Sequence, residues 1–315
     1  MAFMQIIKPG TNIDFIHLRW TALVFSWILI AIGIGSFIYH GGPNYGIDFT
    51  GGVMVHLRFN KATAIGEIRD ALTPARLGDS TIQDFGAGGS EYLVRLPVEA
   101  SETKGISDTV TGALANKFGK DSFEVLRVEL VGPRVGKELR QRALLAVGFA
   151  TLLMGTYIWI RFQFRFGVGA AVALVHDVLI TAGALSLVNY EIDLTAVAAL
   201  LTVVGFSVHD TVIVCDRIRE NMRKSRRETM AKIINRSINE TLSRTVLTTG
   251  TAILVILSLF FLGGNVIRGF AFTLLVGFSI GTYSSIFIAS PIVLWMEPAR
   301  GKARPQPVAA AGRGR

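Results

Sequence analysis

Long apolar runs, separated by shorter polar stretches, set the pattern of this 315-residue chain. A helix needs about 20 mostly apolar residues to cross a hydrocarbon core of roughly 30 Å. Six segments meet or approach that length, so we expect an α-helical membrane protein with six transmembrane helices. The expected spans are residues 18–39, 143–160, 166–188, 194–214, 246–262 and 270–296. Pro291 is expected to kink the sixth span or to end it early.

The Lys and Arg residues gather on one side of this predicted topology. They concentrate in residues 1–17, 161–165, 215–245 and 297–315. The short loops on the opposite side carry Glu191, Asp193 and a single Arg268. The positive-inside rule therefore predicts cytoplasmic N and C termini. We attribute the net charge of +9 to this bias and expect no binding of nucleic acid.

Two of the basic stretches have a further predicted character. Residues 215–245 mix basic with apolar positions and are expected to lie along the cytoplasmic membrane surface. Docking of a cytoplasmic partner is the alternative interpretation. Residues 297–315, rich in Ala, Pro and Arg, predict a disordered cytoplasmic tail that touches anionic membrane lipid.

Residues 40–142, between the first two predicted spans, form one large loop that we expect outside the cytoplasm. The pattern predicts strands at 53–59, 81–85, 91–96 and 123–130 and helices at 63–72 and 107–118. The order β-α-β-β-α-β is that of an α+β ferredoxin-like domain. Its sequence contains neither a nucleophile–base pair nor a metal-ligand cluster, and we interpret His56 as structural.

Asp210 is an ionisable residue within the fourth apolar segment, where insertion costs roughly 2.5 to 3.5 kcal/mol. It has three interpretations: a proton carrier, a structural partner of Arg244, or a solvated residue at a water-filled inlet. Burial and a nearby arginine shift the pKa of a carboxyl group in opposite directions, and this balance would suit loading and release of protons. His209 precedes it and is a second relay candidate, although neighbouring helix residues point about 100° apart.

A similar pair, His176 and Asp177, lies near the middle of the third span. Asp177 could share a proton relay, or it could hold the bundle together through hydrogen bonds to serines and threonines. We favour the structural role for Asp177.

Two glycine-containing motifs frame the outer domain, GIDFTGG at its start and VGPRVGKEL at its end. The glycines permit tight turns, and Asp48 and Thr50 can bond to turn amides. We interpret the motifs as structural hinges that let the domain tilt, with ligand binding as the alternative. The candidate hinge and turn residues are Gly46, Asp48, Thr50, Gly51, Gly52, Gly132, Pro133 and Gly136.

Several segments together resemble the SecF family of protein-export membrane proteins, part of the SecD/SecF group in the resistance-nodulation-division superfamily. The resemblance runs from about residue 15 to 297. Its segments are GIDFTGG, VGPRVGKELR, HDTVIVCDRIREN, RTVLTTG and SIGTYSSIFIASPIV. The combination of several segments in one order makes it specific.

The resemblance implies half of a twelve-helix transporter fold, with SecD as the other half. It further implies work beside the SecYEG channel and SecA, in a bacterial cytoplasmic (inner) membrane. There the pair would use the proton-motive force to promote export of unfolded preproteins. The family's intramembrane aspartate and membrane-edge arginine correspond to Asp210 and Arg244.

Other functional classes remain open at this stage. The chain could be half of a proton-driven exporter of small molecules or lipids, or a purely structural translocon subunit. Sodium could replace protons. An enzyme is not expected, because the sequence contains no catalytic constellation and no nucleotide-binding loop. No cofactor or metal is expected either.

Overall fold

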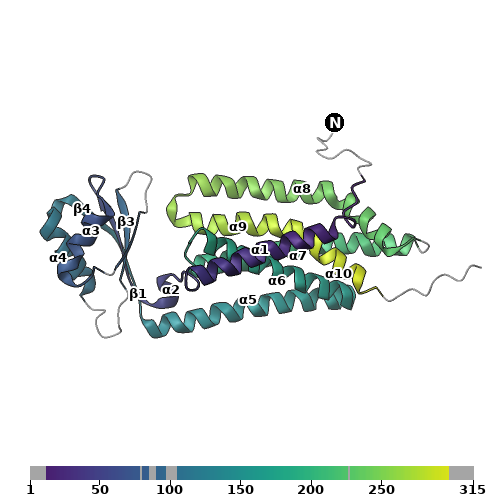
Figure 1. Cartoon of the computed structure of the whole chain (residues 1–315), viewed down its shortest axis with the longest axis horizontal. Helices are drawn as coiled ribbons and strands as arrows, with labels where there is room; N and C mark the ends of the chain where they lie inside the picture. Colours follow the sequence, from purple (N-terminus) through teal and green to yellow (C-terminus); the bar gives the residue numbers. More distant parts are fainter. Residues whose placement is uncertain (1–11, 79, 85–89, 97–104, 226–227, 298–315) are drawn as a thin grey trace, which may run out of the picture.

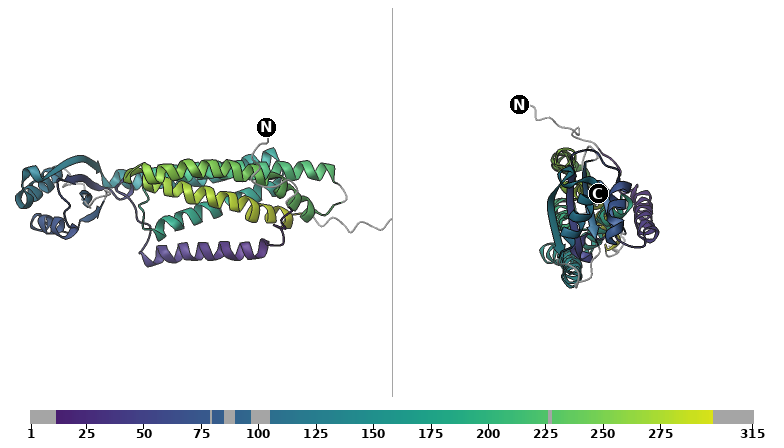
Figure 2. Two further views of the ribbon diagram at one scale, coloured as in Figure 1. Left: turned by 90° about the horizontal axis from the view of Figure 1, so that it is seen from above. Right: turned by 90° about the vertical axis from the view of Figure 1, so that its left-hand side faces the viewer.

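The computed structural model describes residues 12–78, 80–84, 90–96, 105–225 and 228–297. The first eleven residues, part of the turn predicted before residue 91, and the predicted tail beyond Glu297 lie outside the described residues. The molecule is elongated, with a bundle of long helices and a small sheet-containing domain at one end (Figure 1; Figure 2).

Within the described residues, six helical segments are long and apolar enough to cross a membrane. Five are α1 (Arg19–Tyr39), α5 (Pro133–Arg161), α6 (Phe164–Leu187), α7 (Leu194–Lys224) and α8 (Met230–Leu262). The sixth joins α9 (Asn265–Ser284), a π-helical turn at Ser285–Ala289 and α10 (Ser290–Trp295). Helices α6, α7 and the α9 segment are about half buried, whereas α1, α5 and α8 are mostly exposed. The first three therefore form the centre of the bundle.

The last span is irregular immediately before Pro291. Proline lacks the backbone N–H that would bond to the preceding turn, and its ring clashes with that turn. A π-helical turn relieves the clash without breaking the segment. Ser290 adds a bond from its hydroxyl to the Ser285 carbonyl, 2.9 Å long.

Residues 215–245 differ from the expectation that they lie along a membrane surface. They continue α7 and begin α8, which form a helical hairpin beyond the bundle (Figure 1). Their apolar side chains, including Ile233 and Ile234, are buried against Phe15 and Ile16 in one core cluster. An amphipathic stripe can bury its apolar face in protein as well as in lipid, and here the N-terminal segment supplies the protein surface.

The domain between α1 and α5 carries four antiparallel strands in the order β2-β3-β1-β4. The strands are β1 (Gly52–Phe59), β2 (Thr81–Asp84), β3 (Glu91–Leu96) and β4 (Phe123–Val131). Helices α3 (Ile65–Leu72) and α4 (Ile106–Phe118) cover one face, and short turns lie at Thr73–Ala75 and Lys120–Ser122. Alternate residues of β1 pack against the helices in one apolar core. This is the predicted ferredoxin-like arrangement.

The other face of the sheet carries an ion-pair cluster on β1 and β3. Arg58 Nε donates to Glu91 Oε1 at 2.8 Å, and His56 Nε2 lies 3.2 Å from Glu91 Oε2. The bond from Arg58 is the main reason why the pKa of Glu91 lies below its ordinary value of 4.5. Because the pKa of Glu91 is lower in the folded chain, the ionised carboxylate stabilises the fold at any pH above the ordinary value of 4.5. This stabilisation is lost as the pH falls through the lower pKa of the folded state.

We therefore expect Glu91→Gln to destabilise the sheet at neutral pH and to have no effect once Glu91 is protonated. The loss should be small, about 0.5 kcal/mol, because the pair is solvent-screened. Hydrogen exchange of β1 and β3 peptides in the whole chain, compared between variant and parent at each pH, measures it. A difference that persists unchanged in acid would contradict the assignment.

Candidate functional site

Asp210 is completely buried in the bundle, where α7, α8 and α9 meet. Its Oδ2 accepts a hydrogen bond from Thr282 on α9 at 2.9 Å and one from Thr249 on α8 at 3.2 Å. The two threonine hydroxyls lie 2.8 Å from each other. Among the described residues, Oδ1 has no hydrogen-bond partner. One carboxylate oxygen thus links three helices, and the other is free to carry a proton.

Asp177 on α6 is also buried, but its carboxylate has a full set of partners. Oδ2 accepts from Ser207 on α7 at 2.6 Å and from Ser284 on α9 at 2.8 Å. Oδ1 lies 2.9 Å from His176 Nδ1. These bonds tie α6, α7 and α9 together, which is the arrangement a structural role requires.

The two histidines differ in their surroundings. His176 is buried and stacks against Tyr283, with ring centroids 6.2 Å apart. His209 is 58% exposed, and its Nδ1 lies 3.8 Å from Asp210 Oδ1, beyond hydrogen-bond distance. Within the described part of the chain, no group of three or more His, Cys, Asp or Glu side chains could hold a metal ion.

Arg244 does not contact Asp210. It is exposed and precedes Thr249 by five residues, about 7.5 Å along α8. It lines a cleft of about 650 Å³ at the hairpin end of the bundle, together with Asp216, Arg217 and Glu240. Among the described residues, Arg244 forms no ion pair. The predicted relay residues are therefore split between a buried site and this cleft.

The two glycine motifs lie against each other and form one joint. A Cβ at Gly51 would lie 2.6 Å from the Pro133 Cα, and one at Gly136 would lie 2.8 Å from the Gly51 amide nitrogen. Gly51 also has φ +75° and ψ 162°, a backbone region that is almost restricted to glycine. The segments expected as two separate hinges are thus interlocked through their backbones, and hinge motion stays a prediction.

The start of α7 binds to this joint. Asp48, in the short helix α2 (Ile47–Thr50), accepts a bond from the Leu194 amide at 3.0 Å, rather than from a local turn amide. Thr50 likewise donates to the carbonyls of Gly46 and Gly51 instead of accepting from amides. The Gly46 amide donates to the carbonyl of Ile192, the residue before Asp193, at 2.9 Å.

An ion pair adds a side-chain link between the outer domain and the same loop. Arg95 on β3 pairs with Glu191, just before α7. Burial lowers the pKa of Arg95 to about 10, while Asp193, Asp48 and Glu129 act in the opposite direction. The outer domain is therefore attached to the α7 end of the bundle by backbone and by charge.

Bonds from serines or threonines were expected for Asp177, but the individual hydroxyl partners of the two aspartates were not predicted. They are Ser207, Thr249, Thr282 and Ser284. A hydroxyl within an apolar span is the available signal, but such residues commonly bond to the carbonyl of their own helix turn, as Thr251 does. Only the assembled bundle shows which hydroxyls turn toward a carboxylate.

Thr249→Val is expected to destabilise the packing of α7 against α8, because it removes a bond to a buried carboxylate worth roughly 1.5 to 3 kcal/mol. Thr251→Val is the matched control on the same helix, since Thr251 is exposed and bonds only to its own helix. Thermal unfolding of the purified chain compares the two variants. Equal losses in both would show that the Thr249 bond has no special role.

Comparisons with known proteins agree with this architecture. A family model described as "Protein export membrane protein SecD/SecF, C-terminal" matches residues 110–299, and one described as "SecD/SecF GG Motif" matches residues 37–63. The protein translocase subunit SecF of Desulfurispirillum indicum is 48% identical, over 91% of this chain and 92% of that protein. The protein of the same name from Escherichia coli O157:H7 is 41% identical, over 89% of this chain and 87% of that protein.

The fold is similar to that of a solved protein. The crystal structure of SecDF from Thermus thermophilus, described as a translocon-associated membrane protein, superposes with a TM-score of 0.82 at 37% identity. The match covers 91% of this chain but 39% of that longer protein. A structure of SecDF in a super-membrane-facing form gives a TM-score of 0.67. This multi-pass membrane chain, with its ferredoxin-like domain between the first two spans, therefore belongs to the SecF family of protein translocase subunits.

Proposed function

We propose that this chain is one half of a proton-driven motor that, with a SecD partner, promotes late steps of preprotein export through SecYEG. In this proposal SecA supplies the ATP-driven phase of export, and the motor acts on unfolded clients at the outer side of the membrane. The protein resides in the bacterial cytoplasmic membrane with both termini in the cytoplasm. This chain carries the proton site, and its outer domain makes the movement.

The observation that carries the proposal is the contrast between Asp210 and Asp177. Both carboxyl groups are buried at the centre of the bundle. Asp177 has hydrogen bonds on both oxygens, whereas Asp210 Oδ1 has none among the described residues. An incompletely bonded buried carboxylate is costly, and binding a proton removes that cost. Asp210 is therefore the group whose charge a proton gradient would change.

The surface of α7 supports the presence of a second half of the transporter fold, contributed by a partner protein. This central helix exposes a stripe of small and polar residues toward the membrane, unlike the apolar faces of α1 and α5. The stripe comprises Thr195, Ala198, Thr202, Gly205 and His209. Small residues permit close approach of another helix in a membrane. We assign this face to SecD, which would place His209 and the proton path between the two halves.

The energy of one proton is comparable to that of a conformational switch. A charge that crosses a potential of about 100 mV gains roughly 2.3 kcal/mol, and one pH unit adds about 1.4 kcal/mol. Shifting a two-state equilibrium from 1:99 to 99:1 takes about 5.5 kcal/mol. One proton thus supplies most of the energy of a complete switch.

Helix α7 provides the mechanical route in this proposal. Protonation of Asp210 would weaken its bonds to Thr249 and Thr282 and let α7 shift against α8 and α9. The first residue of α7, Leu194, lies about 24 Å away along the helix and bonds to Asp48 in the joint. A shift of α7 would therefore reach the outer domain directly. Arg244 would act from the cleft and not as a direct partner of Asp210.

Completion of preprotein export by membranes that contain or lack this chain tests the proposal. With SecD, SecYEG and SecA present, the chain should raise the fraction of fully exported preprotein under a proton gradient. An uncoupler should remove the gain, and a sodium gradient alone should not restore it. A gain that survives uncoupling would show that the chain is a structural subunit.

A further inference from the structure

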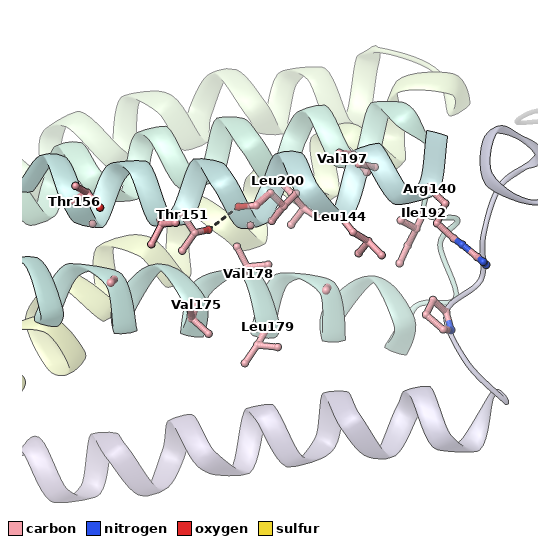
Figure 3. Close-up of a pocket in the computed structure, with 18 of the residues that line it drawn as sticks. Arg140, Leu144, Thr151, Thr156, Val175, Val178, Leu179, Ile192, Val197 and Leu200 are labelled. Carbon is pink, nitrogen blue, oxygen red and sulfur yellow. Dashed lines mark hydrogen bonds between the residues drawn. The ribbon is translucent and has the colours of Figure 1, made fainter. Parts of the chain in front are cut away.

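An apolar groove of about 830 Å³ runs along the seam between α5 and α6, outside the proton site. In Figure 3 the labelled lining residues on the helices come from α5 (Arg140, Leu144, Thr151 and Thr156), from α6 (Val175, Val178 and Leu179) and from the start of α7 (Val197 and Leu200), with Leu179 pointing away from α5. Two residues of α6 in this seam, Val175 and Leu179, are nearly half exposed. The groove is thus open to the surrounding membrane.

Helices α5 and α6 pack less closely in the half of the bundle next to the outer domain. Toward the other end the helices touch, because a Cβ at Gly155 would lie 3.0 Å from the Ala171 Cβ and one at Gly167 would lie 2.6 Å from the Trp159 Cβ. Gly148 also lines the groove, and a Cβ there would meet nothing within 4 Å. The two helices therefore diverge toward the outer domain.

The arginine side chain of Arg140 lies at the end of the groove next to the outer domain. Arg140 lines the mouth of the groove, and its guanidinium lies 5.4 Å from the centre of the Tyr45 ring (Figure 3). Within the described residues, Arg140 forms no ion pair, whereas Arg142, two residues further along α5, pairs with Glu138. A planar guanidinium without a carboxylate, at the level where a membrane begins, complements a phosphate group.

The open part of the groove is about as long as one leaflet of a membrane. Its lining on α5 extends from Arg140 to Trp159, about 28 Å, and the part before the close contact at Gly155, from Arg140 to Thr151, is about 16 Å long, close to half of a hydrocarbon core of roughly 30 Å. We propose that the groove binds a phospholipid of the leaflet next to the outer domain, with one acyl chain in the seam and its phosphate at Arg140.

Photo-crosslinking tests this proposal on the whole chain, reconstituted with and without its SecD partner. The probe is a phosphatidylglycerol or phosphatidylethanolamine that carries a diazirine in one acyl chain, and crosslinked peptides are mapped. Label should concentrate on α5 and α6 residues that line the groove. Gly148→Phe, whose Cβ would meet nothing within 4 Å and whose ring would occupy groove space, should reduce that label at least about fivefold. Gly35→Phe is the matched control, because Gly35 also has open space but lies outside the groove.

The head-group contact has its own variants. Arg140→Gln should weaken groove labelling roughly tenfold, and Arg140→Lys should restore part of it. An excess of inorganic phosphate should not displace the probe, since phosphate lacks the acyl chain. This arm remains decisive if Gly148→Phe fails to fold.

Several outcomes would overturn the proposal. Equal labelling of the parent, Gly148→Phe and Arg140→Gln would mean that the label reports bulk lipid around the bundle. Loss of groove labelling in the presence of SecD would mean that the partner covers this face. Displacement by inorganic phosphate alone would assign the mouth to a free anion.

Discussion

Asp210→Asn is expected to abolish the gradient-dependent part of preprotein export, a drop of roughly tenfold or more, while the chain still assembles with SecD. Asparagine preserves the size of the side chain and can still accept bonds from Thr249 and Thr282. It cannot bind and release a proton near neutral pH. Export rates in membranes with and without an uncoupler measure the effect, and co-purification with SecD measures assembly.

Asp70→Asn is the control for this experiment, because it makes the same chemical change at an exposed carboxylate of the outer domain. It should leave export unchanged. Asp177→Asn should instead lower the stability of the bundle, because the amide oxygen can replace Oδ2 toward Ser207 and Ser284, but an NH2 group then replaces the Oδ1 acceptor beside His176 Nδ1. Full gradient-dependent export by Asp210→Asn would remove Asp210 from the mechanism.

Gly51→Ala is expected to disrupt the joint between the outer domain and the bundle, at a cost of about 3 kcal/mol. Part of that cost is the backbone, because φ +75° with ψ 162° is almost closed to residues with a Cβ. The remainder is overlap, because the added Cβ would lie 2.6 Å from the Pro133 Cα and cannot move away from backbone atoms. Thermal unfolding of the purified chain and proteolysis between the outer domain and α5 measure the change.

Gly132→Ala is the matched control for the joint. Gly132 belongs to the facing motif, has an ordinary φ of −67°, and has nothing within 4 Å of its Cβ position. It should unfold like the parent. Similar stability of Gly51→Ala and the parent would show that the two motifs are separate flexible hinges rather than one interlocked joint.

The sequence predicts the framework of this molecule because apolar length and strand alternation are local signals. The six spans and the ferredoxin-like domain follow from such signals. The hairpin made by the ends of α7 and α8 does not, because an apolar stripe with basic residues suits a membrane surface equally well. Burial of Ile233 and Ile234 depends on Phe15 and Ile16, more than 200 residues away in the chain.

The candidate site shows the same division. An aspartate in an apolar run can be identified from sequence, so Asp210 and Asp177 stand out. The hydroxyls that bond to the two Oδ2 atoms lie 30 to 107 residues away. Which aspartate keeps an unbonded Oδ1 depends on the preceding histidine, which lies 2.9 Å away for Asp177 and 3.8 Å away for Asp210. A direct pair of Asp210 with Arg244, one of the three interpretations of Asp210, is not present among the described residues. The distance between these two side chains depends on how α7 and α8 are offset along each other, and the local sequence of neither helix predicts that offset.

The most direct test of a proton site at Asp210 is infrared difference spectroscopy of the reconstituted chain with its SecD partner. The carbonyl band of a protonated, buried carboxyl group should rise and fall as the pH is changed. We predict that this band disappears in Asp210→Asn and persists in Asp177→Asn. A titrating band that is unchanged in Asp210→Asn, or lost only in Asp177→Asn, would contradict the account.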